Sequence, residues 1–152
     1  MIRELLRSSQ WCYSHKLNRL GAFMEKIMIL TCSAHISGKA KIHPTVSFSH
    51  GGIGVVINGA AEVGEFCIIN NKVTLGNGFP HGGAPRLGKH VYVGTGAFLG
   101  GGITESDYVI IGANSVLTRS VTESGVVVAG VPAKVLRKLT LEELKKLDWE
   151  IL

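Results

Sequence analysis

Apolar side chains recur every six positions through most of this chain, and that spacing constrains the fold more than any other feature. The apolar residues in question are Ile57, Val63, Ile69, Leu75, Leu87, Val93, Leu99, Ile111 and Leu117. A helix, with a period near 3.6 residues, cannot keep such a series on one face. Short strands joined by tight turns can, because alternate strand residues point inward and stacked coils then share one core. The spacing therefore predicts an all-β solenoid, a parallel β-helix of five to six coils over residues 36–136.

Two segments depart from the repeat. The stretch from Gly78 to Pro85 keeps the six-residue phase but has the residue types of a loop, and a loop on a rigid scaffold is a common place for function. Glu105 stands where the repeat calls for an apolar residue, within Glu105-Ser106-Asp107-Tyr108. The simplest interpretation of Glu105 is a turn at an exposed corner.

The two ends of the chain lack the repeat. Residues 1–35 form an N-terminal segment whose apolar spacing predicts one or two amphipathic helices. In the C-terminal segment, residues 137–152, Thr140 and Glu143 match the capping box that opens a helix. We expect this helix to run from Leu141 to Trp149, with Leu141, Leu144 and Leu147 on its apolar side.

Composition excludes several classes of protein. The 152 residues fit one domain, and the net charge of +5 is spread along the chain without a basic run, which argues against nucleic acid and leaves an anionic small ligand open. The cysteines Cys12, Cys32 and Cys67 form no CxxC pair, so neither disulfides nor a zinc ribbon is expected. The apolar stretch Ile27–Cys32 is too short for a transmembrane segment or signal peptide. The composition favours a cytoplasmic protein.

Three segments together resemble the serine acetyltransferase-like hexapeptide-repeat acyltransferases, in the polysaccharide O-acetyltransferase branch. They are Ser49–Ile57, Asn71–Gly76 and Ala129–Val135. The resemblance implies a left-handed β-helix, a homotrimer, and acetyl-CoA bound as acyl donor in a cleft between neighbouring subunits. The sequence rules alone could not provide the handedness, because parallel crossovers are right-handed in about 98% of cases.

The resemblance also implies the candidate site. His50 matches the catalytic histidine, since a neutral imidazole can take the proton of an attacking hydroxyl. His81 resembles the family's second active-site histidine, which would orient the acceptor. The remaining candidates are Ser49, Asn71 and Phe79 for the acceptor, and Gly94, Thr95, Gly112, Ala113, Arg119, Gly130 and Lys134 for acetyl-CoA. Arg137 and Lys138 are close enough in sequence to assist with the phosphates, whereas His43 and His90 fall in ordinary repeat turns.

Departures from the family pattern bear on the acceptor. Ser49 and Pro80 stand where serine acetyltransferases usually have an aspartate and an arginine, and Ala84 holds the place before proline that the second histidine often occupies. Losing a charged contact of this kind costs about 1.5–3 kcal/mol, so the sequence favours a sugar hydroxyl as acceptor. L-serine is the alternative acceptor, and a non-catalytic scaffold is a further one. A metal enzyme resembling γ-class carbonic anhydrases is disfavoured, because no two of the six histidines lie within five positions.

Overall fold

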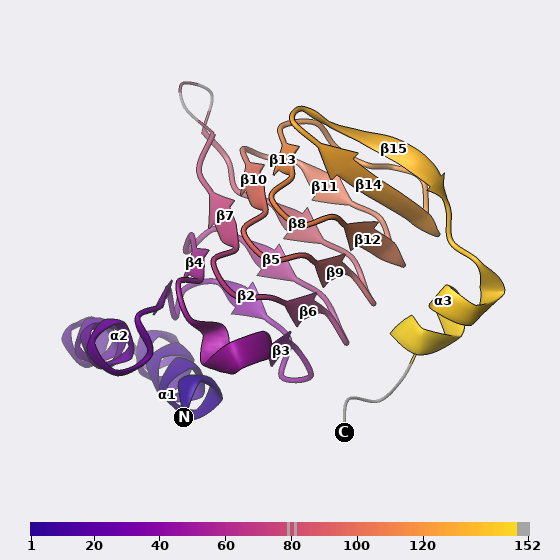
Figure 1. The fold of residues 1–152 in the computed structure, drawn as a ribbon. Coiled ribbons are helices and arrows are strands. Elements are labelled where there is room, and N and C mark those ends of the chain that lie inside the picture. The colour runs from indigo at the N-terminus through magenta and orange to yellow at the C-terminus, as the bar shows by residue number, and fades with distance from the viewer. Residues whose placement is uncertain (79, 81, 149–152) are drawn as a thin grey trace.

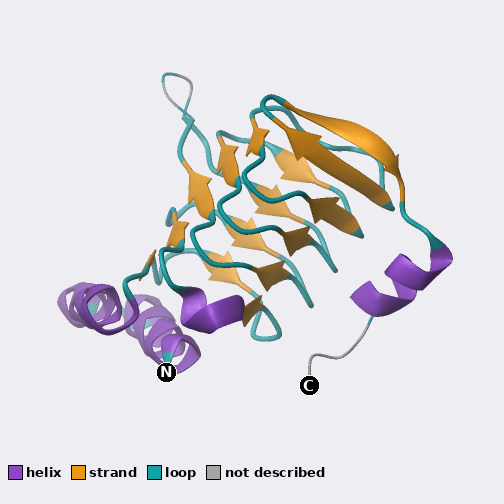
Figure 2. Ribbon diagram, in the orientation of Figure 1, coloured by secondary structure: helices purple, strands orange, loops and turns teal. Residues whose placement is uncertain are grey.

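In the computed structural model, short strands wind around a triangular prism whose three faces are parallel sheets (Figures 1 and 2). The structure describes residues 1–78, 80 and 82–148. Sheet 1 contains β1 (His35–Ile36), β4 (Val56–Ile57), β7 (Thr74–Gly76), β10 (Phe98–Gly100) and β13 (Val116–Leu117). Sheet 2 contains β2 (Lys41–Ile42), β5 (Glu62–Val63), β8 (Arg86–Leu87) and β11 (Thr104–Glu105). Sheet 3 contains β3 (Ser47–Phe48), β6 (Ile68–Ile69), β9 (Tyr92–Val93), β12 (Val109–Ile111), β14 (Val126–Gly130) and, antiparallel to β14, β15 (Ala133–Lys138).

The six-residue spacing is explained by one inward side chain per strand. Strand pairing stacks these side chains into columns, for example Ile36, Ile57, Leu75, Leu99 and Leu117 in sheet 1. All five are buried, and together with the other columns they form one continuous core. The prediction of a left-handed parallel β-helix is confirmed.

The number of coils is smaller than the sequence predicts. Four turns are complete, and a fifth consists of β13, a single bridge at Val121 and β14. The expectation of five to six coils was wrong because β15 turns back antiparallel on β14 and the loop between β7 and β8 adds residues without adding a coil.

The expectation that Glu105 lies in an exposed turn is also wrong. Glu105 is the inward residue of β11, pairs with Leu87 below it and bridges to Val121 above it. It is 1% exposed, and neither carboxyl oxygen makes a hydrogen bond within the part of the chain that the structure describes. Burial raises the pKa of this carboxyl to about 8, and a weak interaction with the Val121 backbone offsets only part of that effect.

Two helices cover the N-terminal end of the prism (Figure 1). They are α1 (Ile2–Ser14) and α2 (Asn18–Cys32), and their buried residues Ile2, Leu6, Met28 and Cys32 extend the core beyond the first turn. The prediction of one or two helices before the repeat is therefore confirmed.

The C-terminal helix α3 (Leu141–Leu147) begins with the predicted capping box, in which Glu143 N–H donates to Thr140 Oγ1. It ends against the prism edge between sheets 2 and 3, where His90 Nδ1 donates to the Leu147 carbonyl at 2.8 Å and Tyr108 donates to Asp148 at 2.7 Å. Leu147 is buried, whereas Leu141, expected on the same apolar side of the helix, is 79% exposed. Trp149 lies outside the described residues.

Candidate functional site

Most of the predicted site residues lie along one edge of the prism, which we call the 3–1 edge because the chain passes there from sheet 3 to sheet 1. Ser49 and His50 occupy it in the first turn, Asn71 in the second, Thr95 in the third and Ala113 in the fourth. Gly94 and Gly112 precede the last two, and Gly130 lies at the same end of sheet 3, where β14 turns into β15. Residues far apart in the sequence therefore share one edge.

Hydrogen bonds connect successive turns along this edge. The Gly96 amide donates to the Asn71 carbonyl at 3.0 Å, and the Asn114 amide donates to the Thr95 carbonyl at 2.8 Å. The Thr95 hydroxyl also donates to Asn71 Oδ1 at 3.0 Å, which fixes the orientation of that amide. Among the described residues the Asn71 amide nitrogen has no acceptor, so its N–H groups remain free to donate.

His50 presents an unengaged imidazole. It belongs to the 3-10 segment Ser49–Gly52 between β3 and β4, it is exposed, and within the described residues its ring makes no hydrogen bond. Its backbone is left-handed, with φ of +52°, but Lys72 and Asn114 adopt similar angles at the same edge. The conformation therefore belongs to the corners of this fold, and what distinguishes His50 is the free ring.

The glycines of the 3–1 edge are explained by packing between turns. A Cβ atom on Gly94 would lie 2.6 Å from the Ala113 nitrogen, and one on Gly112 would lie 2.7 Å from the Ala129 Cβ. Neither position tolerates a side chain, whether or not a ligand binds. The accessible surface for a ligand is provided by Thr95, which is half-buried, and by Ala113 and Gly130, which are exposed.

Two predicted cations line one hollow at the C-terminal end of the prism. The hollow has a volume of about 360 Å³, and its walls include the inward residues Leu117, Val121 and Val128 of the last turn. Arg119 and Lys134 line it, and neither forms an ion pair with another described residue. This arrangement leaves two positive charges available to an anionic group.

The other two basic candidates are already engaged. Arg137 donates two hydrogen bonds to the Glu143 carboxylate, at 2.7 and 2.8 Å, and this bidentate contact lowers the pKa of Glu143 to about 2. Lys138 Nζ lies 3.6 Å from Glu123 Oε1. Arg137 therefore joins α3 to β15, and it is not a free cation for phosphates.

The loop between β7 and β8 leaves the prism at a different edge, the 1–2 edge between sheets 1 and 2. In Figure 1 the described residues of this loop leave the side of the prism beyond β7, away from the segment that carries His50. The candidates Phe79 and His81 lie outside the described residues. Ala84, which precedes Pro85 at the end of the loop, is buried. A hollow of about 600 Å³ adjoins the base of the loop and is lined by Asn77, Gly78, Phe98, Gly101 and Thr118 among others.

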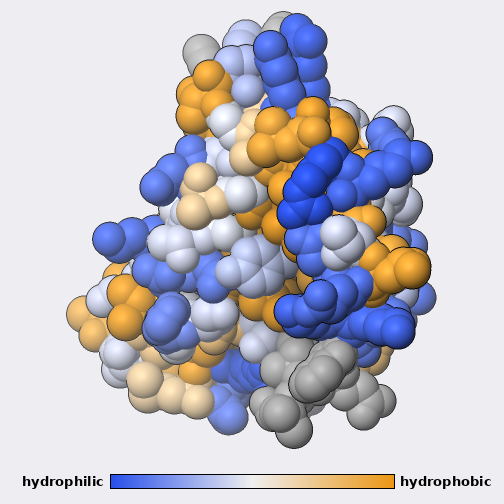
Figure 3. Space-filling model, turned by 45° about the vertical axis from the view of Figure 1, so that its right-hand side comes forward, coloured by the Kyte–Doolittle hydropathy of each residue, from blue (hydrophilic) through white to orange (hydrophobic). Residues whose placement is uncertain are grey.

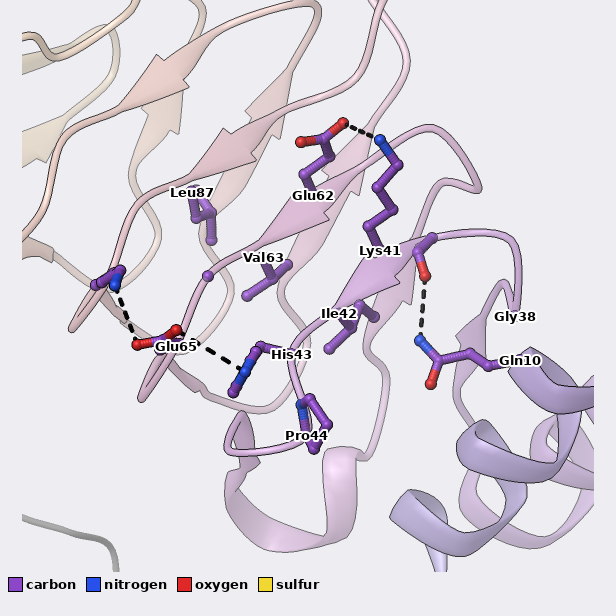
Figure 4. Close-up of a pocket in the computed structure, with 13 residues that line it drawn as sticks. Gln10, Gly38, Lys41, Ile42, His43, Pro44, Glu62, Val63, Glu65 and Leu87 are labelled. Carbon is purple, nitrogen blue, oxygen red and sulfur yellow. Dashed lines mark hydrogen bonds and ion pairs between the residues drawn. The ribbon is translucent and has the colours of Figure 1, made fainter. Parts of the chain in front are cut away.

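Sequence reasoning did not identify two further hollows. One of about 580 Å³ lies on sheet 2 (Figure 4), where Lys41 pairs with Glu62 at 2.9 Å and Glu65 lies between His43 and Lys89. Its charged side chains are paired with one another within the described residues. The other, of about 390 Å³, lies beside α2 and includes Glu25, whose carboxylate accepts from the Ser37 hydroxyl and the Gly38 amide. Nothing in the local sequence around these residues signals either hollow.

Comparisons with known proteins place the fold. A scan against protein-family models and a search of curated proteins gave no match. Solved structures do match, among them the serine acetyltransferase of Vibrio cholerae O1 biovar El Tor, with 26% identity and a TM-score of 0.88 over 97% of this chain and 57% of that one. The serine acetyltransferase of Neisseria gonorrhoeae in complex with serine has 26% identity and a TM-score of 0.83 over 90% and 55% of the two chains. A serine acetyltransferase in complex with CoA has 27% identity and a TM-score of 0.81 over 89% and 55%. The chain thus spans little more than half the length of the structures it matches.

Proposed function

We propose that this chain is an acetyl-CoA-dependent O-acetyltransferase in which His50 is the general base and the acceptor is a hydroxyl of a sugar or surface-polysaccharide precursor. The observation that carries the proposal is the exposed, unengaged His50 ring on the edge that also holds Asn71, Thr95 and Ala113. The likeness to solved serine acetyltransferases, one of them in complex with CoA, supports the same reaction class.

The proposed reaction needs one proton relay. The acceptor oxygen attacks the thioester carbonyl carbon while its proton passes to the His50 ring, and a carbon–oxygen bond forms. The carbon–sulfur bond then breaks, and the protonated ring returns the proton to the departing thiolate. A ring with no hydrogen bond to another described residue is suited to this exchange, because both nitrogens remain available to the reactants.

Charge and surface shape support a binding path for the donor. Arg119 and Lys134 line the hollow at the end of the prism, where they can bind the phosphates of CoA. From there the pantetheine arm would follow Gly130, Ala113 and Thr95 toward His50, over backbone with little side-chain cover. The residues present therefore fit an extended anionic acyl donor.

The separation of His50 from the β7–β8 loop favours a homotrimer. The two lie on different edges of one prism, so a single chain does not place the loop beside the base. In a threefold assembly a neighbouring chain can place its loop against the 3–1 edge. His81 would then contribute to a site formed between subunits.

Two candidates remain for the acceptor, a sugar hydroxyl and L-serine. Ser49 and Pro80 supply neither the carboxylate nor the guanidinium that would hold a zwitterionic amino acid, which supports a sugar hydroxyl. The matched structure in complex with serine supports the second candidate, L-serine.

An acceptor screen tests the proposal. Thiol release from acetyl-CoA would be followed with L-serine, nucleotide sugars and oligosaccharides, and we expect a sugar to give the fastest release. His50→Ala should lower kcat by about 10²- to 10⁴-fold, as expected for loss of a general base. His43→Ala is the matched control, since His43 is also exposed at a corner, where its ring contacts Thr45 and lies 4.0 Å from Glu65 Oε1. Faster release with L-serine would select the second candidate, and no release with any acceptor would favour a scaffold.

A further inference from the structure

An apolar stripe on α2 faces solvent. Leu20, Phe23, Ile27 and Leu30 are spaced by three, four and three residues, which places them on one side of the helix. The opposite side contains the buried Gly21, Met28 and Cys32. Leu20, Phe23 and Leu30 are 43%, 54% and 84% exposed, and an exposed apolar patch of this kind marks an interaction surface. We call these four residues the α2 stripe.

Basic side chains border the α2 stripe. Arg19 and Lys26 are exposed and fall along one margin of it, at 100° per residue around the helix. The only acidic residue of α2, Glu25, is turned toward the prism, where its carboxylate binds Ser37 and Gly38. The solvent face of α2 is therefore apolar and positively charged.

The same sign of charge extends over the whole N-terminal segment. Residues 1–32 contain five basic side chains, Arg3, Arg7, Lys16, Arg19 and Lys26, and two acidic ones. The second acidic residue, Glu4, pairs with the amino terminus. Within the described part of the chain, none of the five basic side chains forms an ion pair. These charges therefore remain available to an external partner.

Charge complementarity decides between a second copy and a different partner. If two stripes packed together, Arg19 and Lys26 of both chains would gather at one interface with no acidic side chain to neutralise them, and like charges oppose such contacts. A bilayer with anionic lipids supplies both negative charge and an apolar layer for the stripe. No helix in the described residues is long and apolar enough to cross a membrane, so the contact would be confined to the surface.

We propose that the α2 stripe and its basic border dock the protein on an anionic membrane surface, with α2 lying in the plane of the interface. Figure 1 places α1 and α2 at the end of the prism away from β14 and β15, and Figure 3 shows apolar side chains in orange at that lower left part of the molecule. Docking through α2 would leave the C-terminal hollow at the end of the prism away from the bilayer. The proposal does not depend on the acetyl-transfer chemistry, because no residue of the α2 stripe or its basic border belongs to the proposed catalytic or donor site.

Sedimentation with lipid vesicles tests it on the full chain. We expect binding to vesicles of 70% phosphatidylcholine and 30% phosphatidylglycerol, much weaker binding to phosphatidylcholine alone, and a decline with added salt. Arg19→Gln with Lys26→Gln should weaken binding about 25-fold, at about fivefold for each charge. Phe23→Ser with Leu30→Ser should weaken it more than tenfold.

Matched variants at the other end of the molecule serve as controls. Leu136→Ser with Leu141→Ser removes two exposed apolar side chains, and Lys145→Gln with Lys146→Gln removes two charges from α3. Both controls should bind vesicles as the wild type does. No binding to anionic vesicles, or equal loss in the controls, would overturn the proposal. A change in sedimentation coefficient without lipid, confined to the α2 stripe variants, would also overturn it and identify a second copy as the partner.

Discussion

Replacing Glu105 by glutamine should remove a strong pH dependence of stability. Glu105 occupies the inward column of sheet 2 above Ile42, Val63 and Leu87, where every other member is apolar. Its carboxyl has no hydrogen-bond partner among the described residues, and burial raises its pKa from an ordinary value of 4.5 to about 8. The folded chain therefore keeps a proton on Glu105 at neutral pH.

The sign and size of the effect follow from proton linkage. Below pH 4.5 the carboxyl is protonated in both states, so its contribution to stability is fully present. Between pH 4.5 and about 8 only the folded chain holds the proton, and the free energy of unfolding falls by about 1.4 kcal/mol per pH unit. Across that window the loss is on the order of 5 kcal/mol, and above it both states are ionised and the loss ends.

Urea denaturation followed by circular dichroism, at intervals from pH 5 to pH 9, measures this difference. Glu105→Gln should flatten the curve relative to the wild type and should be the more stable protein at pH 9. Glu123→Gln is the control, because it removes an exposed carboxylate close to the same turn. Parallel pH curves for the wild type and Glu105→Gln would refute the reasoning, as would an NMR titration of the Glu105 carboxyl near pH 4.5.

Three further predictions follow from particular contacts. Lys134→Gln should raise KM for acetyl-CoA by about tenfold or more while changing kcat less, which steady-state kinetics would show; an unchanged KM would count against the donor site. Gly94→Ala should lower the unfolding free energy, measured by thermal melts, by about 1–3 kcal/mol, because the new Cβ would clash with the Ala113 nitrogen. Gly102→Ala should be tolerated in the same measurement, because a Cβ there would lie 3.8 Å from its nearest neighbour, the Gly83 Cα. Tyr108→Phe should weaken the docking of α3 by about 0.5–1.5 kcal/mol, seen as faster amide exchange in that helix only; unchanged exchange would exclude this contact as its anchor.

The fold was predictable because particular positions in each coil accept only certain residue types, and these residue types recur in the sequence. One inward residue per strand gives the six-residue period, and close stacking at Gly94 excludes larger side chains. The handedness was not predictable from those rules, which favour the right-handed crossover, and it came only from the resemblance. The coil count was overestimated because an antiparallel return such as β15 has the same local composition as another coil.

Glu105 shows how a local rule can fail where the repeat is followed correctly. A carboxylate between turn residues indicates an exposed corner, yet Leu99, Glu105 and Ile111 keep the six-residue spacing. The position of Glu105 in the six-residue repeat therefore predicts a buried side chain. The expectation of an exposed turn was based on the polarity of that side chain alone. His90 is a milder case, since the repeat assigned it a structural role, but the contact with the Leu147 carbonyl joins segments that no short pattern relates.

The arrangement of edges explains how far the site itself could be predicted. Motif residues about one coil apart, such as Asn71, Thr95 and Ala113, return to the same edge, so a linear pattern translates into a spatial column. The β7–β8 loop follows Asn71 by only part of a coil and so leaves from the next edge, away from His50. If both contribute to one reaction, they must come from different chains, and activity should depend on assembly even when each prism is folded. A substitution that leaves the fold intact but separates the subunits should therefore abolish acetyl transfer, whereas full activity in a folded monomer would assign the chemistry to His50 and its own edge alone.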